Sequence, residues 1–515
     1  MIAIRPLAAA GLFAALLTST GSAQAVQERV DLSVVQKIRD EGLNRSRLDS
    51  LIGYVTDVIG GRLTNSPGNR KANEWAAATF RSWQLANVAI EPWDSAFGRG
   101  WEQVSFSARV LEPVTKQLHA TPQAWSGSTK GTVTCPVVLI DVQDSTELAG
   151  YAGKLRGACV IWTPFRAIQP EFEPVTRRAS LDDLLAPPRA PSEPPQAQQP
   201  QTPEQQAAFR QFRLAGAISR FLRTQQAVAY LRPSGWTYGL LRTGGHLDGR
   251  VARDSVYNPT PDLQVGHEQY GQLYRNAKRG IAQKLELNVQ NRFHDEDRKG
   301  YNVLAEIPGG DKASEVVMLG AHFDSWHSGT GATDNAAGSV IMMEAMRILK
   351  TLGLPMRRTV RIGLWSGEEQ GLLGSRAWVR MHRDQHARIS AYVNVDNGTG
   401  KIRGIWNQSN AAASPIFEQI LFPFRDLGVV AVRHGNTGGT DHLEFDRVGI
   451  PGFNFIQDPI EYGIRSHHSY VDTYERLQID DLKQAATVVA WTVYQLANRE
   501  ELMPRKTSRA TTSGN

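Results

Sequence analysis

The chain has 515 residues, of which 41% are apolar and 21% charged, and its formal net charge is +6. This composition excludes a disordered or fibrous protein, and the length suffices for one large core and a second, smaller one. The Lys and Arg residues are scattered and form no long basic block. We therefore expect no nucleic-acid partner.

Residues 1–25 have the pattern of a signal peptide. Arg5 gives a positive start, residues 7–17 are apolar, and Ala23-Gln24-Ala25 is a small-residue cleavage site. A membrane anchor is the alternative, but the apolar stretch is shorter than the about 20 residues that span a bilayer. We expect no membrane span elsewhere. The sequence thus predicts an exported protein, periplasmic or secreted.

Two cysteines, Cys135 and Cys159, each begin a strand-like run. Export to an oxidising compartment would permit a disulfide between them, and pairing of neighbouring strands would bring them together. The Cα separation that a disulfide requires cannot be read from the sequence. A disulfide and two buried thiols therefore both stay open.

The first half of the chain divides into a helical part and a β-rich part. Apolar residues recur at three- and four-residue spacing across residues 34–85, which predicts helices. Short β-rich runs separated by Gly and Pro begin near residue 104. We interpret residues 227–233 and 262–293 as a continuation of this β pattern.

Residues 118–293 are predicted to form a separate, mainly β domain. It is inserted between an N-terminal helical part, 26–117, and a second part of the main domain, 294–503. Within the insert, residues 184–205 are dense in Pro and Gln. Because such a composition cannot build a core, we expect a mobile exposed loop there.

From Tyr301 onward, strand-like and helix-like patterns alternate, and a closing helix is expected over residues 480–498. Such alternation is typical of an α/β fold with a mostly parallel mixed sheet covered on both faces, a three-layer αβα architecture. The polar tail, 504–515, is expected to be disordered.

Acidic and histidine side chains follow successive strands of this part. In an open α/β sheet, sites form beyond the carboxyl ends of the strands. Taken singly, each of these residues has an ordinary explanation, as a surface histidine or a solvated helix start. Together, the carboxylates of this set would repel one another unless cations were present. The residues are His322, Asp324, Asp334, Glu368, Glu369, Asp396, His467 and His468.

Two histidines and three carboxylates without a thiolate suit zinc, with manganese or cobalt as substitutes. Five ligands exceed the needs of one tetrahedral ion with an open position. A pair of ions about 3.5–4 Å apart, bridged by a carboxylate, fits better. Adjacent glutamates at a strand end point in different directions, so one can bind metal while the other acts as a base.

Several segments resemble the co-catalytic zinc exopeptidase family, which includes bacterial zinc aminopeptidases, glutamate carboxypeptidase and carboxypeptidase Q. They occur in the family's order, and YNVLAEIPG upstream is similar to the family's entry strand. The inserted β domain resembles the protease-associated domain of several members. The segments are AHFDS, GATDNAAG, WSGEEQGLLGS, VNVDNG, GGTDHLEFDRVGIPG and HHSYVDTYE.

The resemblance implies a ligand for each position of a two-zinc site. His322 and Asp396 would bind one ion, Glu369 and His468 would bind the other, and Asp334 would bridge the two. Whether the peptide that follows the bridging aspartate is cis cannot be read from the sequence.

The resemblance also implies roles beside the ligands. Glu368 would be the general base and acid, and Asp324 would orient His322 through its second ring nitrogen. Several relatives have Tyr where this chain has His467. His467 either donates a hydrogen bond to the oxyanion, which we favour, or forms only a pocket wall. Asp472 either supports His468 or begins a helix.

A Gly- and Thr-rich loop precedes the last predicted strand and resembles the family's substrate-side loop. Thr440, Asp441 and His442 are its candidates for substrate binding, and a simple turn is the alternative. His327 lies between the ligands in sequence. The family has no ligand there, so we expect a surface or pocket-rim position.

The sequence thus predicts an exported zinc-dependent exopeptidase that cleaves dipeptides or short peptides with metal-activated water, similar to carboxypeptidase Q. A broad-specificity zinc aminopeptidase is the alternative. A non-catalytic receptor or scaffold with this fold is disfavoured because every ligand is present. The inserted domain is expected to cap the cleft or to mediate homodimerisation.

Overall fold

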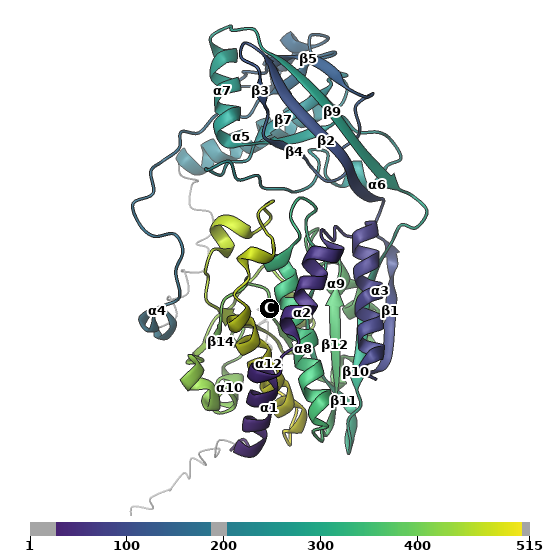
Figure 1. The fold of residues 1–515 in the computed structure, drawn as a ribbon, viewed down its shortest axis with the longest axis vertical. Coiled ribbons are helices and arrows are strands. Elements are labelled where there is room, and N and C mark those ends of the chain that lie inside the picture. The colour runs from purple at the N-terminus through teal and green to yellow at the C-terminus, as the bar shows by residue number, and fades with distance from the viewer. Residues whose placement is uncertain (1–26, 187–202, 507–515) are drawn as a thin grey trace, which may run out of the picture.

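The computed structural model describes residues 27–186 and 203–506, which form two bodies, each built on its own sheet (Figure 1). The predicted signal peptide, residues 187–202 of the predicted loop and residues 507–515 of the predicted tail lie outside the described residues. The first residues of that tail are ordered, which corrects the prediction. Arg505 donates hydrogen bonds to the carbonyls of His386 and Ile389, at 2.7 and 3.1 Å.

The first body contains an eight-stranded mixed sheet whose central strands β12, β11, β13 and β16 are mutually parallel. Its edges are antiparallel at β1/β10, β10/β12 and β14/β16. In spatial order the strands are β1 (Ala86–Ala96), β10 (Lys299–Ile307), β12 (Arg358–Trp365), β11 (Lys312–His322), β13 (Ile389–Asn394), β16 (Gly452–Gln457), β14 (Ile402–Trp406) and β15 (Ala431–Arg433).

Helices cover both faces of this sheet, which confirms the three-layer αβα prediction. The central strand β11 shows why: Val317 and Leu319 pack into the core under α8 and α12, whereas Met318 packs under α9 and α11. A strand buried on both faces must be apolar at successive positions. The helices of this body are α1 (Leu32–Asn44), α2 (Leu48–Gly53), α3 (Pro67–Ser82), α8 (Ala337–Leu352), α9 (Leu373–Met381), α10 (Ser414–Leu421), α11 (His442–Arg447) and α12 (Ile479–Asn498).

The second body lies at the top of Figure 1 and holds another eight-stranded sheet. Its long strand β2 pairs antiparallel with β9 from Gly100 to Glu112, so this sheet starts before the predicted boundary at residue 118. Its strands are, in spatial order, β3 (Lys116–Gln117), β2 (Gly100–Glu112), β9 (Lys284–His294), β5 (Val133–Leu139), β6 (Cys159–Ile161), β7 (Ala229–Pro233), β8 (Asp262–Val265) and β4 (Ala120–Pro122).

This second body also contains helices that the β interpretation missed. Only β8 is a strand in the first part of residues 262–293, and α7 follows it. Tyr270 and Leu273 are buried, and Tyr274 and Ala277 pack beside them, which is helical spacing. The helices are α5 (Pro203–Leu222), α6 (Arg250–Asp254) and α7 (His267–Lys278). Helix α4 (Leu181–Leu185) instead packs against β15 of the first body.

Cys135 of β5 and Cys159 of β6 form a disulfide, with a Cα–Cα distance of 5.6 Å. The two strands are parallel neighbours, and both cysteines are fully buried in the core of the second body. The structure thus decides between the alternatives that the sequence left open.

Among the described residues, no helix combines the length and apolarity that crossing a bilayer demands.

Replacing both Cys135 and Cys159 with Ala is expected to lower the free energy of unfolding by about 3 kcal/mol, because the crosslink spans a sequence separation of 24 residues and restricts the unfolded chain. Urea unfolding followed by circular dichroism measures the change. Reduction of the wild-type protein is the control and should shift the same transition. An unchanged unfolding midpoint would contradict this stabilising role.

Candidate metal site

The predicted ligands meet because the central strands are parallel and adjacent. His322 is the last residue of β11, Glu369 follows β12, and Asp396 follows β13. Parallel strands end at the same sheet edge, so these side chains converge there. His467 and His468 reach the same edge from the segment after β16.

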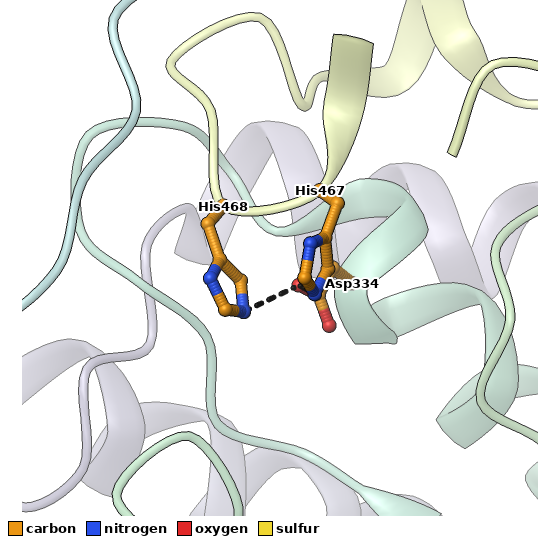
Figure 2. A group of neighbouring side chains, drawn as sticks. All are labelled: Asp334, His467 and His468. Carbon is orange, nitrogen blue, oxygen red and sulfur yellow. Dashed lines mark ion pairs between the residues drawn. The ribbon is translucent and has the colours of Figure 1, made fainter. Parts of the chain in front are cut away.

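Asp334 lies between two groups of ligands. His322 Nε2 is 3.3 Å from Asp334 Oδ1 and 3.4 Å from Asp396 Oδ1. On the other side, His468 Nε2 is 3.4 Å from Asp334 Oδ2 and 2.9 Å from Glu369 Oε2. Figure 2 shows the histidine side of this arrangement. The structure thus brings all five predicted ligands together, with one oxygen of Asp334 facing each group.

These side chains suit the binding of metal. His322 Nε2, Asp334 Oδ2 and Glu369 Oε1 are buried and have no hydrogen-bond partner among the described residues. Buried polar atoms without partners are rare in proteins and call for an explanation such as an ion. The oxygen and imidazole nitrogen donors are those that zinc accepts.

The electrostatics of the site also call for cations. Burial, together with the neighbouring carboxylates, raises the pKa of Glu368 and of Glu369 well above the usual range. Burial alone would raise the pKa of Asp334 too, but its interaction with the neighbouring His322 outweighs burial and lowers that pKa. Without ions the site would therefore retain protons on its glutamates, and bound cations would displace them.

Backbone hydrogen bonds fix the bridging residue. Asp472 accepts the amides of Thr333 and Asp334, at 2.7 and 3.1 Å. The sequence predicted that Asp472 either supports His468 or begins a helix. Neither role matches these contacts with the backbone of the Asp334 loop. The peptide bond between Asp334 and Asn335 is cis.

Asp324 contacts two segments that carry predicted site residues, His322 and the Glu368-Glu369 pair. His322 Nδ1 lies 3.1 Å from the backbone oxygen of Asp324 and 3.5 Å from its carboxylate. The carboxylate instead accepts the amides of Glu368 and Glu369, at 3.3 and 3.4 Å, and the hydroxyl of Thr64, at 2.8 Å. The backbone carbonyl of Asp324 therefore orients His322, whereas the carboxylate of Asp324 holds the backbone of Glu368 and Glu369.

A cavity of about 540 Å³ opens over the ligands. Glu368 lines it, with Oε2 at 3.9 Å from His322 Nε2, so this glutamate faces both the ligands and the space for a substrate. The lining residues are Asp334, Glu368, Glu369, Gly371, Leu372, Asp396, Asn397, Gly438, Gly439, Thr440, Tyr462, His467 and His468.

Of the three predicted substrate-binding residues, Thr440 alone lines this cavity. Asp441 is buried behind it and accepts a hydrogen bond from Ser375 at 2.5 Å, and burial raises the pKa of Asp441 to about 7. His442 is buried at the start of α11, 2.6 Å from Gln408 Nε2, and burial lowers its pKa to about 4. Asp441 and His442 therefore support the cavity wall, which corrects the predicted contact with substrate.

His467 stacks on His468, with ring centroids 3.7 Å apart, and its Nε2 is 3.8 Å from Asp334 Oδ2. Tyr462, which the sequence interpretation missed, also lines the cavity, and its hydroxyl is 3.5 Å from Asp396 Oδ1. Its only signal in the sequence is its place in the loop that leads to the histidine pair.

His327 does not line this cavity. Its Nε2 lies 2.9 Å from the carbonyl of Pro122, and its ring meets Trp101 edge-on. Pro122 and Trp101 belong to strands of the second sheet, so His327 contacts the other body. His327 therefore lies against the second body, and not at the predicted surface or pocket rim.

Residues 302–493 match the profile of peptidase family M28. Carboxypeptidase Q of Pongo abelii is 27% identical over 489 residues, which cover 92% of this chain and 89% of that protein.

Two solved structures show the same fold. A peptidase M28 precursor from Shewanella amazonensis superimposes with a TM-score of 0.67 and 24% identity, over 92% of this chain and 98% of that one. A zinc aminopeptidase from Bacillus subtilis gives a TM-score of 0.57 and 17% identity, over 88% and 95%.

Removal of metal with a chelator is expected to lower the melting temperature by several degrees, because the buried carboxylates then repel one another and the stabilisation by bound ligand is lost. Zinc should restore the melting temperature, whereas magnesium, which prefers oxygen ligands and keeps its water, should not. Differential scanning fluorimetry makes the measurement. Identical melting curves before and after chelation would argue against a metal site.

Proposed function

We propose that the chain, whose residues 302–493 match family M28, is an exported zinc-dependent exopeptidase of that family that cleaves dipeptides or short peptides and is similar to carboxypeptidase Q. The observation that carries the proposal is the pair of ligand groups on either side of Asp334, at the floor of a cavity.

His322 and Asp396 would hold one zinc ion, Glu369 and His468 the other, and Asp334 both. When bound, the ions supply Lewis acidity, which polarises the scissile carbonyl and makes water a better nucleophile. The protein itself contributes a fixed donor set, since Asp472 and Asp324 hold the backbone of the ligand-bearing loops.

Glu368 is the proposed proton carrier. It takes one proton from the attacking water and delivers it to the leaving amine nitrogen as the peptide bond breaks. Its position supports this role, because the side chain lines the cavity beside the ligands and makes no ion pair with Lys or Arg among the described residues. Its raised pKa favours holding the proton between the two transfers.

His467 is the proposed donor to the oxyanion. Its Nδ1 lies 3.5 Å from Nη2 of Arg242. Because a guanidinium can only donate, this contact favours the tautomer with the proton on Nε2. That nitrogen faces the ligand group, where negative charge would develop on the carbonyl oxygen.

We propose that the second body, the predicted protease-associated domain, caps the site. Thr243 donates its amide to the carbonyl of His468 at 2.7 Å, and Arg242 and Ser469 form an isolated antiparallel bridge. These contacts join the second body directly to the histidine pair. They favour a cap over a role confined to homodimerisation.

Hydrolysis of a free dipeptide, compared with its N-blocked and C-blocked forms, tests which end is recognised. A dipeptidase or carboxypeptidase of the carboxypeptidase Q type should lose activity on C-blocked substrates. A broad aminopeptidase should cleave them and reject N-blocked ones; the Bacillus subtilis structure is that of a zinc aminopeptidase. Absence of hydrolysis by the zinc-loaded protein would instead favour a non-catalytic receptor or scaffold.

Replacing Glu368 with Gln is expected to lower kcat by at least about 100-fold while zinc content stays unchanged, because the amide cannot carry a proton but is not a proposed ligand. Dipeptide turnover and elemental analysis on the same preparation measure both. Replacing Glu369 with Gln is the matched comparison, and it should reduce zinc content as well. Near-normal turnover of the Glu368 variant would show that the base is misassigned.

Replacing His467 with Phe should lower kcat by roughly 10- to 100-fold with little change in zinc content, because a phenyl ring fills the same space but donates no hydrogen bond. Steady-state kinetics and metal analysis make the comparison. Unchanged kcat would leave His467 as a pocket wall only.

A further inference from the structure

The segment between α2 and α3 contains a buried arginine without an ion pair. Arg62 is 0% exposed, and it forms no ion pair with a carboxylate of the described residues. Burial lowers its pKa to about 10, so the guanidinium stays charged at neutral pH. A buried charge of this kind is costly unless its donors are satisfied, so its hydrogen bonds should be informative.

Three of its four side-chain hydrogen bonds go to backbone carbonyls next to the ligands, and the fourth, from Nη1 to the carbonyl of Gly60 at 3.0 Å, stays within its own segment. Nε donates to Phe323 at 2.8 Å, Nη1 to Thr330 at 2.6 Å, and Nη2 to Gly331 at 2.8 Å. Phe323 follows the ligand His322, and the other two carbonyls belong to the loop that leads to Asp334. The planar guanidinium thus connects the residue after His322 to the segment that leads to Asp334.

Thr64, two residues further along the chain, connects to the loop that carries Glu368 and Glu369. Its hydroxyl donates to Asp324 Oδ2 at 2.8 Å and accepts the amide of Gly367 at 3.0 Å. The same carboxylate accepts the amides of Glu368 and Glu369. One short segment from the N-terminal part therefore contacts both loops that emerge from β11 and β12.

We propose that Arg62 and Thr64 are positioning residues that set the separation of the ligand-bearing loops and so permit one carboxylate, Asp334, to serve two ions. This inference rests on the proposed two-zinc site. It adds that the N-terminal segment, which supplies no ligand, determines metal affinity and the placement of the base Glu368.

A lysine at position 62 would keep the charge but lose the planar guanidinium, so it cannot bond both segments with the same geometry. Arg62→Lys is expected to raise the zinc dissociation constant at least about tenfold, the usual cost of losing a group that orients ligands. Arg358 offers a matched control. It is also 0% exposed and donates to backbone carbonyls, of Arg499 and Glu500, although it pairs with Glu315 as well; it begins β12 and thus lies at the opposite edge of the sheet.

The experiment titrates full-length, metal-free proteins with zinc against a chromophoric chelator, and follows their thermal unfolding in parallel. Arg358→Lys should lower stability without changing zinc affinity, whereas Arg62→Lys should weaken zinc binding. Equal zinc affinity of Arg62→Lys and wild type, or equal losses in both Arg→Lys variants, would overturn the inference. Failure of the wild type to bind zinc would refute the proposed function instead.

Thr64 supplies a second test that does not depend on the arginine. Thr64→Val has the same shape without the hydroxyl, and it should lower kcat about tenfold or more with KM nearly unchanged, because the Glu368 loop loses its anchor. Thr64→Ser restores the hydroxyl and should restore kcat. If Thr64→Val retains wild-type kcat, or if Thr64→Ser is as impaired as Thr64→Val, Thr64 does not position the base.

Discussion

The structure depends on one electrostatic constraint: several carboxylates are buried within a few ångströms of one another at a single edge of a sheet. Burial disfavours each charge, and the charges repel one another, so the arrangement is stable only with compensating protons or cations. Among the described residues, buried atoms of His322, Asp334 and Glu369 have no hydrogen-bond partner, and they mark where cations would compensate these charges. The rest of the fold can be understood as the framework that holds these groups together despite their repulsion.

Rigid elements oppose that repulsion from three directions. The central parallel strands fix where each ligand-bearing loop begins, and their apolar residues are buried on both faces of the sheet. Asp472 holds the Asp334 loop from the C-terminal side, while Arg62 and Thr64 hold it and its neighbours from the N-terminal side. The second body contacts the histidine segment through Arg242 and Thr243.

The αβα architecture and the meeting of the five ligands could be predicted from sequence, because strand ends and motif spacing are local signals. The supporting contacts could not. Arg62 and Thr64 lie far along the chain from the residues that they hold, and nothing in GGRLTNS indicates burial. Helix α7 was missed because its glycine resembled a turn, and His442 was misplaced because a polar residue in a loop gives no sign that it faces a core.

The central claim is that Asp334 bridges two metal ions, and anomalous diffraction at the zinc absorption edge from crystals of the zinc-loaded protein tests it most directly. The account predicts two anomalous peaks, one on the side of His322 and Asp396 and the other on the side of Glu369 and His468, with the Asp334 carboxylate between them. A single peak, or two peaks without Asp334 between them, would contradict it.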